Sequence, residues 1–374
     1  MQRPTVAEID LSALRYNYHQ VRKLSDSSSR FLAIVKANAY GHGAVRISRE
    51  LEKCGVNFLG VAMCEEAAEL RIAGIKSSIL VMGGIFHGQE DDVFKYDLNP
   101  VIYDMESARS LNARAAQSGV RLKVHVKLDT GMGRVGILPG EVEAFFSSMK
   151  DCHQLQVDGL LTHLAIADVI DDTATNFTCS QIDAFTSLVK KITEMGFSPT
   201  CLHLANSAAI IRTLDSSFNL VRPGIMLYGI SPSPALHIDL KPVLSLKTKI
   251  IALKKITKGC SISYRRTFIS ERESLIATLP IGYADGYSRQ FSNRSAVVIH
   301  GRRAPVAGVV CMDMTMVDVT DIPAVNMHDE VILLGSQGSQ SISAHELAEI
   351  ARSIPYEILC GISSRVPRQY LNGS

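Results

Sequence analysis

Lys36 stands where an apolar stretch of the sequence closes. The residues AIVKANAYGHGA are typical of a buried strand that ends at this lysine, followed by a turn-rich segment that holds Tyr40 and His42. Burying a charged side chain at the end of an apolar strand costs free energy unless the charge is paired or hydrogen-bonded, so a lysine at this position is a candidate functional residue. A partly desolvated lysine becomes a usable nucleophile or base. The alternative is a lysine whose stem packs on the strand while its ammonium group reaches solvent.

Two later segments carry further polar side chains at the ends of apolar stretches. KLDTGMGRVG places Arg134 in a glycine-rich loop, which suits an oxyanion or a carboxylate, although a solvated arginine in an ordinary turn has the same pattern. THLA places His163 at the end of the next apolar stretch. A lone histidine is more often structural than catalytic, but its position at a strand end makes it a candidate site residue.

The segments HLANSAA and VRPGIMLYG have the features of a phosphate site. Ser207 is placed to open a helix, and Gly224 lies in a tight turn. Backbone N–H groups at such positions bind anions. A phosphate site together with a strand-end lysine indicates either pyridoxal phosphate (PLP) or a sugar phosphate as the ligand, and the residue pattern alone does not choose between them.

These residues must be positioned by a regular alternation of short apolar strands and amphipathic helices. We expect strands at residues 31–37, 58–63, 78–83, 100–104, 122–129, 157–165, 201–207 and 220–229. Eight parallel strands joined by helices predict an α/β fold, a TIM-like (β/α)8 barrel. In such a barrel the chemistry collects at the carboxyl ends of the strands, and the loops after strands seven and eight commonly bind phosphate.

The sequence changes character after Ser231. SPSPALH is typical of a linker, and β-branched, alternating segments separated by turn residues follow it. This pattern predicts a mainly antiparallel β domain. We therefore expect a barrel domain over residues 1–235 and a C-terminal β domain over residues 236–374.

Composition excludes several classes of protein. The 374 residues carry a net charge of +2 and include no apolar run long enough to span a bilayer, so we expect neither a nucleic acid nor a membrane as partner. The first residues lack the apolar segment of a signal peptide. Eight cysteines are scattered without a C-x-x-C pair, so we expect no metal and reduced thiols in a cytoplasmic protein.

Taken together, the motifs resemble those of the bacterial alanine racemases. The resemblance runs from VAEIDLSALRYN to SSRVPRQY, and its most specific segments are AIVKANAYGHG, KLDTGMGRVG, THLA, ANSAA, RPGIMLYG, SYRRTF, GYADGY, CMDM and PYEILC. Their shared order makes chance agreement improbable. The resemblance implies a PLP-dependent isomerase that interconverts L- and D-alanine and supplies D-alanine for peptidoglycan.

The resemblance also implies roles for individual residues. Lys36 would carry PLP and act as the base on the D-alanine face, and Tyr264 would be the base on the L-alanine face. Arg134 and Met312 would contact the substrate. Lys127 matches a lysine that is often carbamylated in the family, the alternative being an unmodified strand lysine. The other positions implied in cofactor binding are Tyr40, His163, Ser207, Arg222, Gly224, Ile225 and Tyr356.

Two of these implied roles bear on assembly and on the type of reaction. Tyr264 and Met312 reach the partner's active site in the family, so the resemblance implies a homodimer with shared sites. Arg222 would face the pyridine nitrogen of the cofactor and suppress transamination, because an arginine does not give up its proton. Related barrel decarboxylases have an acidic residue there, which argues against that activity.

The chain departs from the family pattern at two positions. Arg265 follows the tyrosine where the family usually has glycine, and Val309 stands where the family often has arginine. Both positions belong to the family's substrate entrance, where that arginine faces an acidic residue matching Asp168. The alternatives to an alanine racemase are a PLP racemase of another small amino acid such as serine, a non-catalytic PLP carrier, and a metal-dependent barrel enzyme.

Overall fold

The chain forms two compact units. The computed structural model describes residues 3–26, 28–214 and 218–373. One unit, the barrel unit, consists of Arg15–Ala39 and Ala44–Leu240. The other, the β unit, combines the N-terminal segment up to Leu14, the short segment Tyr40–Gly43 and the chain from Lys241 onward.

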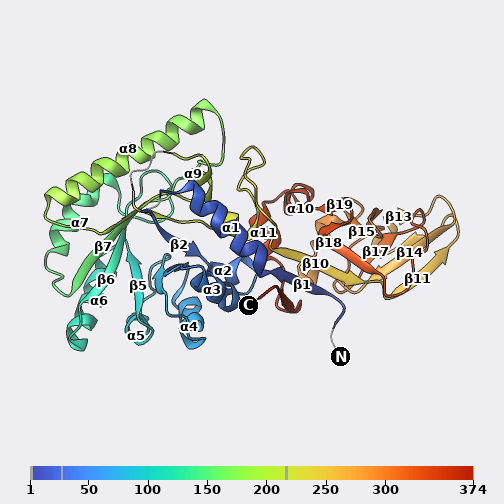
Figure 1. Ribbon diagram of the computed structural model, residues 1–374, viewed down its shortest axis with the longest axis horizontal. Helices are drawn as coiled ribbons and strands as arrows, with labels where there is room; N and C mark the ends of the chain where they lie inside the picture. The colour runs from blue at the N-terminus through green and yellow to red at the C-terminus, as the bar shows by residue number, and fades with distance from the viewer. Residues whose placement is uncertain (1–2, 27, 215–217, 374) are drawn as a thin grey trace. The chain divides into compact units, whose positions relative to one another are not determined.

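A parallel sheet of eight strands forms the centre of the barrel unit, in the order β8-β7-β6-β5-β4-β3-β2-β9 (Figure 1). The strands are β2 (Arg30–Ile34), β3 (Phe58–Val61), β4 (Ser78–Val81), β5 (Leu98–Ile102), β6 (Leu122–Lys127), β7 (Leu155–Leu161), β8 (Cys201–His203) and β9 (Leu220–Val221). The Arg222 N–H donates to the Ala205 carbonyl at 2.9 Å, which links the segments that follow β9 and β8. The sequence-based prediction of a (β/α)8 barrel is confirmed.

Helices precede and connect the barrel strands. They are α1 (Leu11–Leu24), α2 (Lys36–Tyr40), α3 (Ala44–Lys53), α4 (Cys64–Ile72), α5 (Glu90–Lys95), α6 (Met105–Ser118), α7 (Val142–Met149), α8 (Asp172–Glu194) and α9 (Ser207–Ile211), with short 3-10 turns at Pro139–Glu141 and Ile225–Tyr228. Local sequence sets their ends. The side chains of Asp104 and Asp171 accept backbone N–H groups at the starts of α6 and α8. Gly119, at φ 64°, ends α6 in the left-handed region.

The β unit contains a seven-stranded sheet, a three-stranded sheet and a two-stranded hairpin. The strands of the large sheet are β1 (Val6–Asp10), β10 (Leu244–Lys249), β15 (Ala296–Ile299), β16 (Arg302–Pro305), β18 (Glu330–Gln337), β19 (Gln340–Ile342) and β20 (Arg368–Leu371). The smaller sheets are formed by β11 (Ala252–Ile256), β14 (Ser274–Leu279) and β17 (Thr315–Asp318), and by β12 (Ser261–Ile262) and β13 (Phe268–Ile269). The helices α10 (Ala344–Ala351) and α11 (Pro355–Cys360) and 3-10 turns at Tyr264–Arg266, Tyr283–Asp285 and Arg289–Phe291 complete the unit. The predicted mainly antiparallel β domain is confirmed.

The N-terminal strand β1 differs from the expected division of the chain. It pairs antiparallel with β10 and parallel with β20, so its hydrogen-bonding partners belong to the C-terminal sheet. Its alternating residues Ala7 and Ile9 are fully buried. The sequence-based division placed this strand in the barrel domain, which was expected to begin at residue 1. A short alternating strand carries no local signal of the sheet that it joins, so its true partners could not be predicted. The start of the β unit at Lys241 lies close to the expected boundary at 235.

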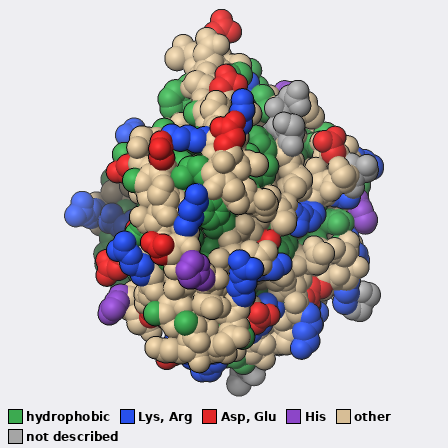
Figure 2. All heavy atoms as spheres, turned by 90° about the vertical axis from the view of Figure 1, so that its left-hand side faces the viewer, with side chains coloured by type: hydrophobic (Ala, Val, Ile, Leu, Met, Phe, Trp, Pro, Cys, Tyr) green, Lys and Arg blue, Asp and Glu red, His purple; other side chains and the backbone are tan. Residues whose placement is uncertain are grey.

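Three further features concern the surface, the helices and the cysteines. On the face of the molecule in Figure 2, lysine and arginine side chains are interspersed with acidic ones, and neither sign dominates. In the described part of the chain, no helix has the length and apolar content needed to cross a membrane. All eight cysteines are free.

Candidate active site

Lys36 begins an unusual backbone turn at the carboxyl end of β2. The residues that follow it, Ala37, Asn38 and Ala39, have φ values of 52–54° and ψ values of 45–51°, which is a left-handed turn without any glycine. L-residues adopt this conformation at a cost of about 1–2 kcal/mol each. Such backbone persists only where surrounding contacts hold it, and it clusters at functional sites.

Glu66 in α4 holds this turn from the neighbouring strand connection. One of its carboxylate oxygens accepts the Ala37 N–H at 2.6 Å, and the other accepts the Ala62 N–H at 2.7 Å. The side chain of Asn38 accepts the Ala44 N–H at 2.8 Å and joins the turn to α3. Glu66 is not among the site residues predicted from the sequence. Its position in the first turn after an apolar strand was the available signal.

We expect Glu66→Ala to destabilise the turn at Lys36. The substitution removes the acceptor for three backbone N–H groups, those of Ala37, Ala62 and Met63. This loss corresponds to about 1–3 kcal/mol in the free energy of unfolding. Urea denaturation measures this loss. The control is Glu69→Ala, because Glu69 is exposed on the same helix. Equal midpoints for the two variants would show that Glu66 does not hold the turn.

Arg222 follows β9 and is anchored deep in the barrel. Its Nη1 donates to the His203 carbonyl at 2.7 Å, and its Nη2 donates to the carbonyls of Thr162 and Leu204 at 2.8 and 3.0 Å. Nη1 also lies 3.2 Å from His203 Nδ1, and Nη2 lies 3.2 Å from His163 Nδ1. Among the described residues, none accepts from Arg222 Nε, so this N–H is available to a ligand.

The environment of Arg222 sets its charge and that of His163. Burial, followed by the nearby Arg134, lowers the pKa of Arg222 to about 9, so the guanidinium stays protonated at neutral pH. Burial, followed by the charges of Arg222, Arg134, Lys127 and Lys36, lowers the pKa of His163 to about 3. His163 is therefore neutral, and its Nδ1 accepts from Arg222, which leaves the proton on Nε2.

Ser207 and Gly224 form a joined pair at the ends of β8 and β9. The Gly224 N–H donates to Ser207 Oγ at 3.0 Å. Asn206 caps α9 by accepting the Ala209 N–H at 3.1 Å. The Ile34 N–H donates to the Pro223 carbonyl at 3.0 Å, which ties this segment to the strand that carries Lys36. The segment that holds Gly224 thus lies beside the end of β2, and Ser207 is hydrogen-bonded to it.

The glycine-rich loop after β6 is organised by Asp129. One of its carboxylate oxygens accepts the N–H groups of Gly131, Met132 and Gly133 at 2.9–3.1 Å. Burial raises the pKa of Asp129, but these bonds outweigh it and the net pKa is lowered. The loop ends beside Lys127, whose Nζ donates to the Val135 carbonyl at 2.6 Å. The loop therefore fixes the backbone around Arg134, whose own side chain is exposed.

Lys127 lies buried at the end of β6. Burial, followed by the charge of Arg134, lowers its pKa to about 8. A measurable fraction of this amine is therefore neutral near pH 7. A larger fraction of Lys127 is therefore neutral than of an exposed lysine with an ordinary pKa.

The remaining predicted residues belong to the β unit. Tyr40 and Tyr356 meet edge to face with their ring centroids 5.7 Å apart. Tyr40 is buried, and burial raises the pKa of its phenol. The close approach of Gly41 to α11 supports this pairing, because a Cβ at Gly41 would lie 2.4 Å from the Leu359 carbonyl oxygen.

Tyr264 and Met312 project from adjoining loops of the β unit. Tyr264 is 68% exposed and Met312 is 52% exposed. Ser263 donates from its hydroxyl to the Val309 carbonyl at 2.6 Å, which joins the Tyr264 turn to the segment that leads to Met312. Arg265 has φ 61°, a conformation that favours glycine. The backbone therefore has the form that a glycine would adopt without strain.

Two sequence models of one family match the chain. The model described as "Alanine racemase, N-terminal domain" matches residues 9–232, and "Alanine racemase, C-terminal domain" matches residues 243–370. The alanine racemase of Halothermothrix orenii is 47% identical over 372 residues, which cover 99% of this chain and 97% of that protein.

Solved structures give the same result. The alanine racemase of D-cycloserine-producing Streptomyces lavendulae superposes with a TM-score of 0.94 at 33% identity, covering 100% of this chain and 98% of that one. An alanine racemase from Bartonella henselae with covalently bound pyridoxal phosphate gives a TM-score of 0.89 at 28% identity, covering 99% of this chain and 100% of that one. The similarity therefore extends over both units.

Proposed function

This chain belongs to the alanine racemase family, and we propose on that premise that it interconverts L-alanine and D-alanine with PLP as its cofactor. The observation that carries the proposal is the pair of cations on neighbouring strands, Lys36 after β2 and Arg222 after β9. A lysine supplies the amine to which PLP is attached. An arginine that faces the pyridine nitrogen would favour racemisation over reactions that need a protonated ring nitrogen.

The donor set around Lys36 fits PLP. Ser207, Gly224 and Ile225 offer a hydroxyl and backbone N–H groups suited to a phosphate at the ends of β8 and β9. Arg222 offers its Nε–H to the ring nitrogen. When bound, PLP supplies the electron sink that stabilises negative charge at the substrate Cα.

Lys36 and Tyr264 carry the proton transfers in this proposal. For L-alanine, the phenolic oxygen of Tyr264 removes the Cα proton, and the Lys36 Nζ delivers a proton to the opposite face. The reverse reaction exchanges the two roles. Each base serves one face, so the substrate does not have to turn over. His163 beside Arg222 is neutral, so it does not act as a second acid in the site.

We propose that Tyr264 and Met312 complete the site of a second copy of this chain. Both side chains are more than half exposed in the single chain, although a tyrosine base and a substrate-binding loop function only in a desolvated site. A homodimer with shared sites covers them. This proposal also assigns the chain to the cytoplasm, where it supplies D-alanine for peptidoglycan.

Carbamylation of Lys127 is part of the same proposal. Carbon dioxide reacts with neutral amines, and the lowered pKa of Lys127, about 8, provides that form. The carbamate is an anion and would sit beside Arg134, whose charge already lowers the pKa of this lysine. It would steady Arg134 for contact with the substrate.

We expect Arg265 to supply the positive charge that Val309 does not provide at the substrate entrance. Val309 is buried and Arg265 is exposed. Arg265→Gly relieves the positive φ and should raise the KM for alanine while leaving kcat close to its original value, because the charge acts before chemistry. Arg266→Gly, with φ 52°, is the control for backbone effects. An unchanged KM and unchanged inhibitor access would refute this role.

The choice of substrate is tested by comparing alanine with serine. We expect kcat/KM for L-alanine to exceed that for L-serine, each measured by chiral chromatography on PLP-loaded protein. A higher value for serine would identify a serine racemase instead. A protein that binds PLP and racemises neither amino acid would indicate a PLP carrier.

A further inference from the structure

A chain of three buried side chains runs from Arg222 away from the cofactor side of the barrel. His203 Nδ1 lies 3.2 Å from Arg222 Nη1, and His203 Nε2 lies 2.9 Å from His125 Nδ1. Both histidines are fully buried, His125 on β6 and His203 on β8. Neither residue is among those proposed above to contact the cofactor or the substrate.

Arg222 fixes the direction of every hydrogen bond in this chain. A guanidinium only donates, so His203 Nδ1 must accept and its proton must lie on Nε2. That Nε2–H then donates to His125 Nδ1, which places the His125 proton on its own Nε2. Burial lowers the pKa of His125 to about 4 and that of His203 well below its usual value, so both rings are neutral as this pattern requires.

Packing holds the His125 ring in one orientation. A Cβ at Gly159 would lie 2.3 Å from His125 Nδ1, so the ring occupies space that only a glycine leaves free. The ring also meets His203 edge to face with centroids 5.1 Å apart and lies near Phe58 at 6.0 Å. In this position Nδ1 is held toward His203.

The other ring nitrogen of His125 is unpaired. Within the described residues, Nε2 of His125 has no hydrogen-bond partner. A buried donor without an acceptor costs about 1–3 kcal/mol, which an apolar side chain at this position would avoid. The hydrogen bond that His125 Nδ1 accepts from His203 Nε2 explains why a polar ring is present at this position despite that cost.

A metal site is the competing explanation for this cluster. Ligand atoms of His125, Asp158 and Cys201 lie within 4.8 Å of one another and come from three different strands, so no sequence motif could have indicated the set. The required tautomer puts a proton on His125 Nε2, and Lys123 Nζ lies 3.8 Å from the Asp158 carboxylate. Both features oppose a cation, and we assign no metal to the cluster.

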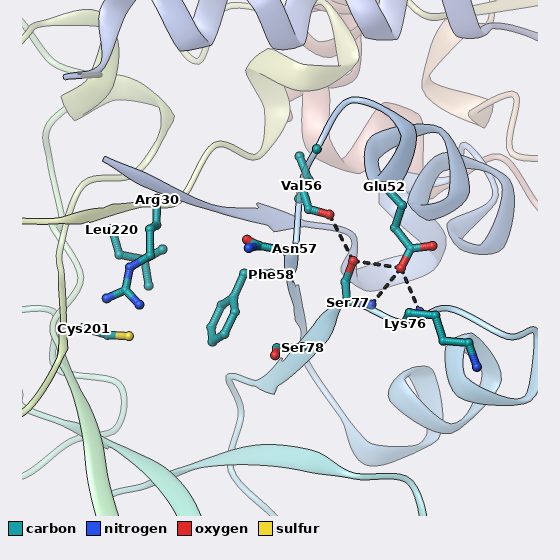
Figure 3. Close-up of a pocket in the computed structure, with 11 residues that line it drawn as sticks. Arg30, Glu52, Val56, Asn57, Phe58, Lys76, Ser77, Ser78, Cys201 and Leu220 are labelled. Atoms are coloured by element: carbon teal, nitrogen blue, oxygen red, sulfur yellow. Dashed lines mark hydrogen bonds between the residues drawn. The ribbon is translucent and has the colours of Figure 1, made fainter. Parts of the chain in front are cut away.

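The surroundings of Cys201 agree with that choice. A cavity of about 680 Å³ opens at the amino ends of the barrel strands. Figure 3 shows Arg30, Cys201 and Leu220 along one side of it, and Glu52, Lys76 and Ser77 along the other. The guanidinium of Arg30 is thus a second positive charge near the cluster.

We propose that His125 is a positioning residue that acts through His203 to hold the Arg222 guanidinium in the orientation that presents Nε–H to the cofactor. His125 accepts from His203 and selects its tautomer, and that tautomer gives Arg222 Nη1 its acceptor. The inference rests on the proposed function, because it assigns a purpose to the free Nε–H of Arg222. It adds to that function a residue that contacts neither cofactor nor substrate.

The test compares His125→Leu with His125→Asn in PLP-loaded protein. Leucine removes the acceptor, whereas the Asn side-chain oxygen can occupy the place of Nδ1. We expect His125→Leu to raise by about tenfold the fraction of turnovers that end with the cofactor in its aminated form, because a misplaced Arg222 no longer suppresses transamination. His125→Asn should stay near the wild-type value. This fraction is a ratio, so partial unfolding does not change it.

A second readout needs no turnover. The imidazole ¹⁵N shifts of the resting holoenzyme should show His203 neutral with its proton on Nε2, and His125→Leu should change them. A His203 protonated on Nδ1, or a Leu variant with the wild-type fraction of aminated cofactor, would overturn the proposal. Equal effects of Leu and Asn would also overturn it. Wild-type racemisation in the same assay separates these results from a failure of the proposed function.

Discussion

Lys36→Ala is expected to abolish racemisation in both directions and to release the cofactor from its covalent attachment. Each direction uses the Lys36 amine once, as a base or as an acid, and an alanine side chain can neither attach the cofactor nor transfer a proton. Loss of a positioned acid or base lowers rates by up to about 10⁴-fold, and loss of the covalent link adds to this. We therefore expect a decrease of at least this size.

Two measurements check this prediction. Chiral chromatography follows D-alanine formed from L-alanine, and the visible absorption of the protein follows the attached cofactor. Lys190→Ala is the control, because Lys190 is exposed on α8 and its ion pair with Glu194 contributes little to stability. A Lys36→Ala protein that keeps both its absorption and its activity would show that Lys36 is not the attachment site.

Tyr264→Phe is expected to separate the two faces of the substrate. The variant lacks the phenolic oxygen alone, and Tyr264 is 68% exposed in the single chain, so the core of the β unit is undisturbed. Racemisation needs both bases and should fall by about 10²–10⁴-fold. Exchange of the D-alanine Cα proton with solvent needs Lys36 alone and should continue without inversion.

Proton exchange in deuterated water distinguishes the two faces. We expect Tyr264→Phe to incorporate deuterium into D-alanine and to leave L-alanine almost unlabelled, as followed by mass spectrometry of each enantiomer. Tyr96→Phe, at the end of α5 in the barrel unit, should behave as the wild type. Loss of exchange from both enantiomers, or its retention in L-alanine, would contradict a one-face role for this tyrosine.

The barrel was predictable because its signal is local. Each of its eight strands is a short apolar run closed by turn residues, and β/α alternation leaves few alternatives to a closed parallel sheet. The residues at the strand ends follow from that fold. Lys36, Arg134, His163, Ser207 and Gly224 were identified from their positions at the ends of apolar segments.

Features that depend on distant pairing or on unusual backbone were not predictable. Residues 37–39 contain no glycine, so nothing local indicates a left-handed turn, and Glu66 stabilises it from another strand connection. Strand β1 joins the C-terminal sheet across the length of the chain. The bond between His125 and His203 joins residues 78 positions apart. In each case the deciding contact is tertiary.

Deuterium incorporation during racemisation tests the central claim most directly. Purified, PLP-loaded protein is incubated with L-alanine in deuterated water. The enantiomers are separated by chiral chromatography, and the deuterium content of each is measured by mass spectrometry. The proposed function predicts D-alanine that carries deuterium at Cα and that does not form with Lys36→Ala. Protein that binds PLP but yields no D-alanine, or D-alanine that keeps its original Cα hydrogen throughout, would contradict the assignment of Lys36 and Tyr264 as the two bases of an alanine racemase.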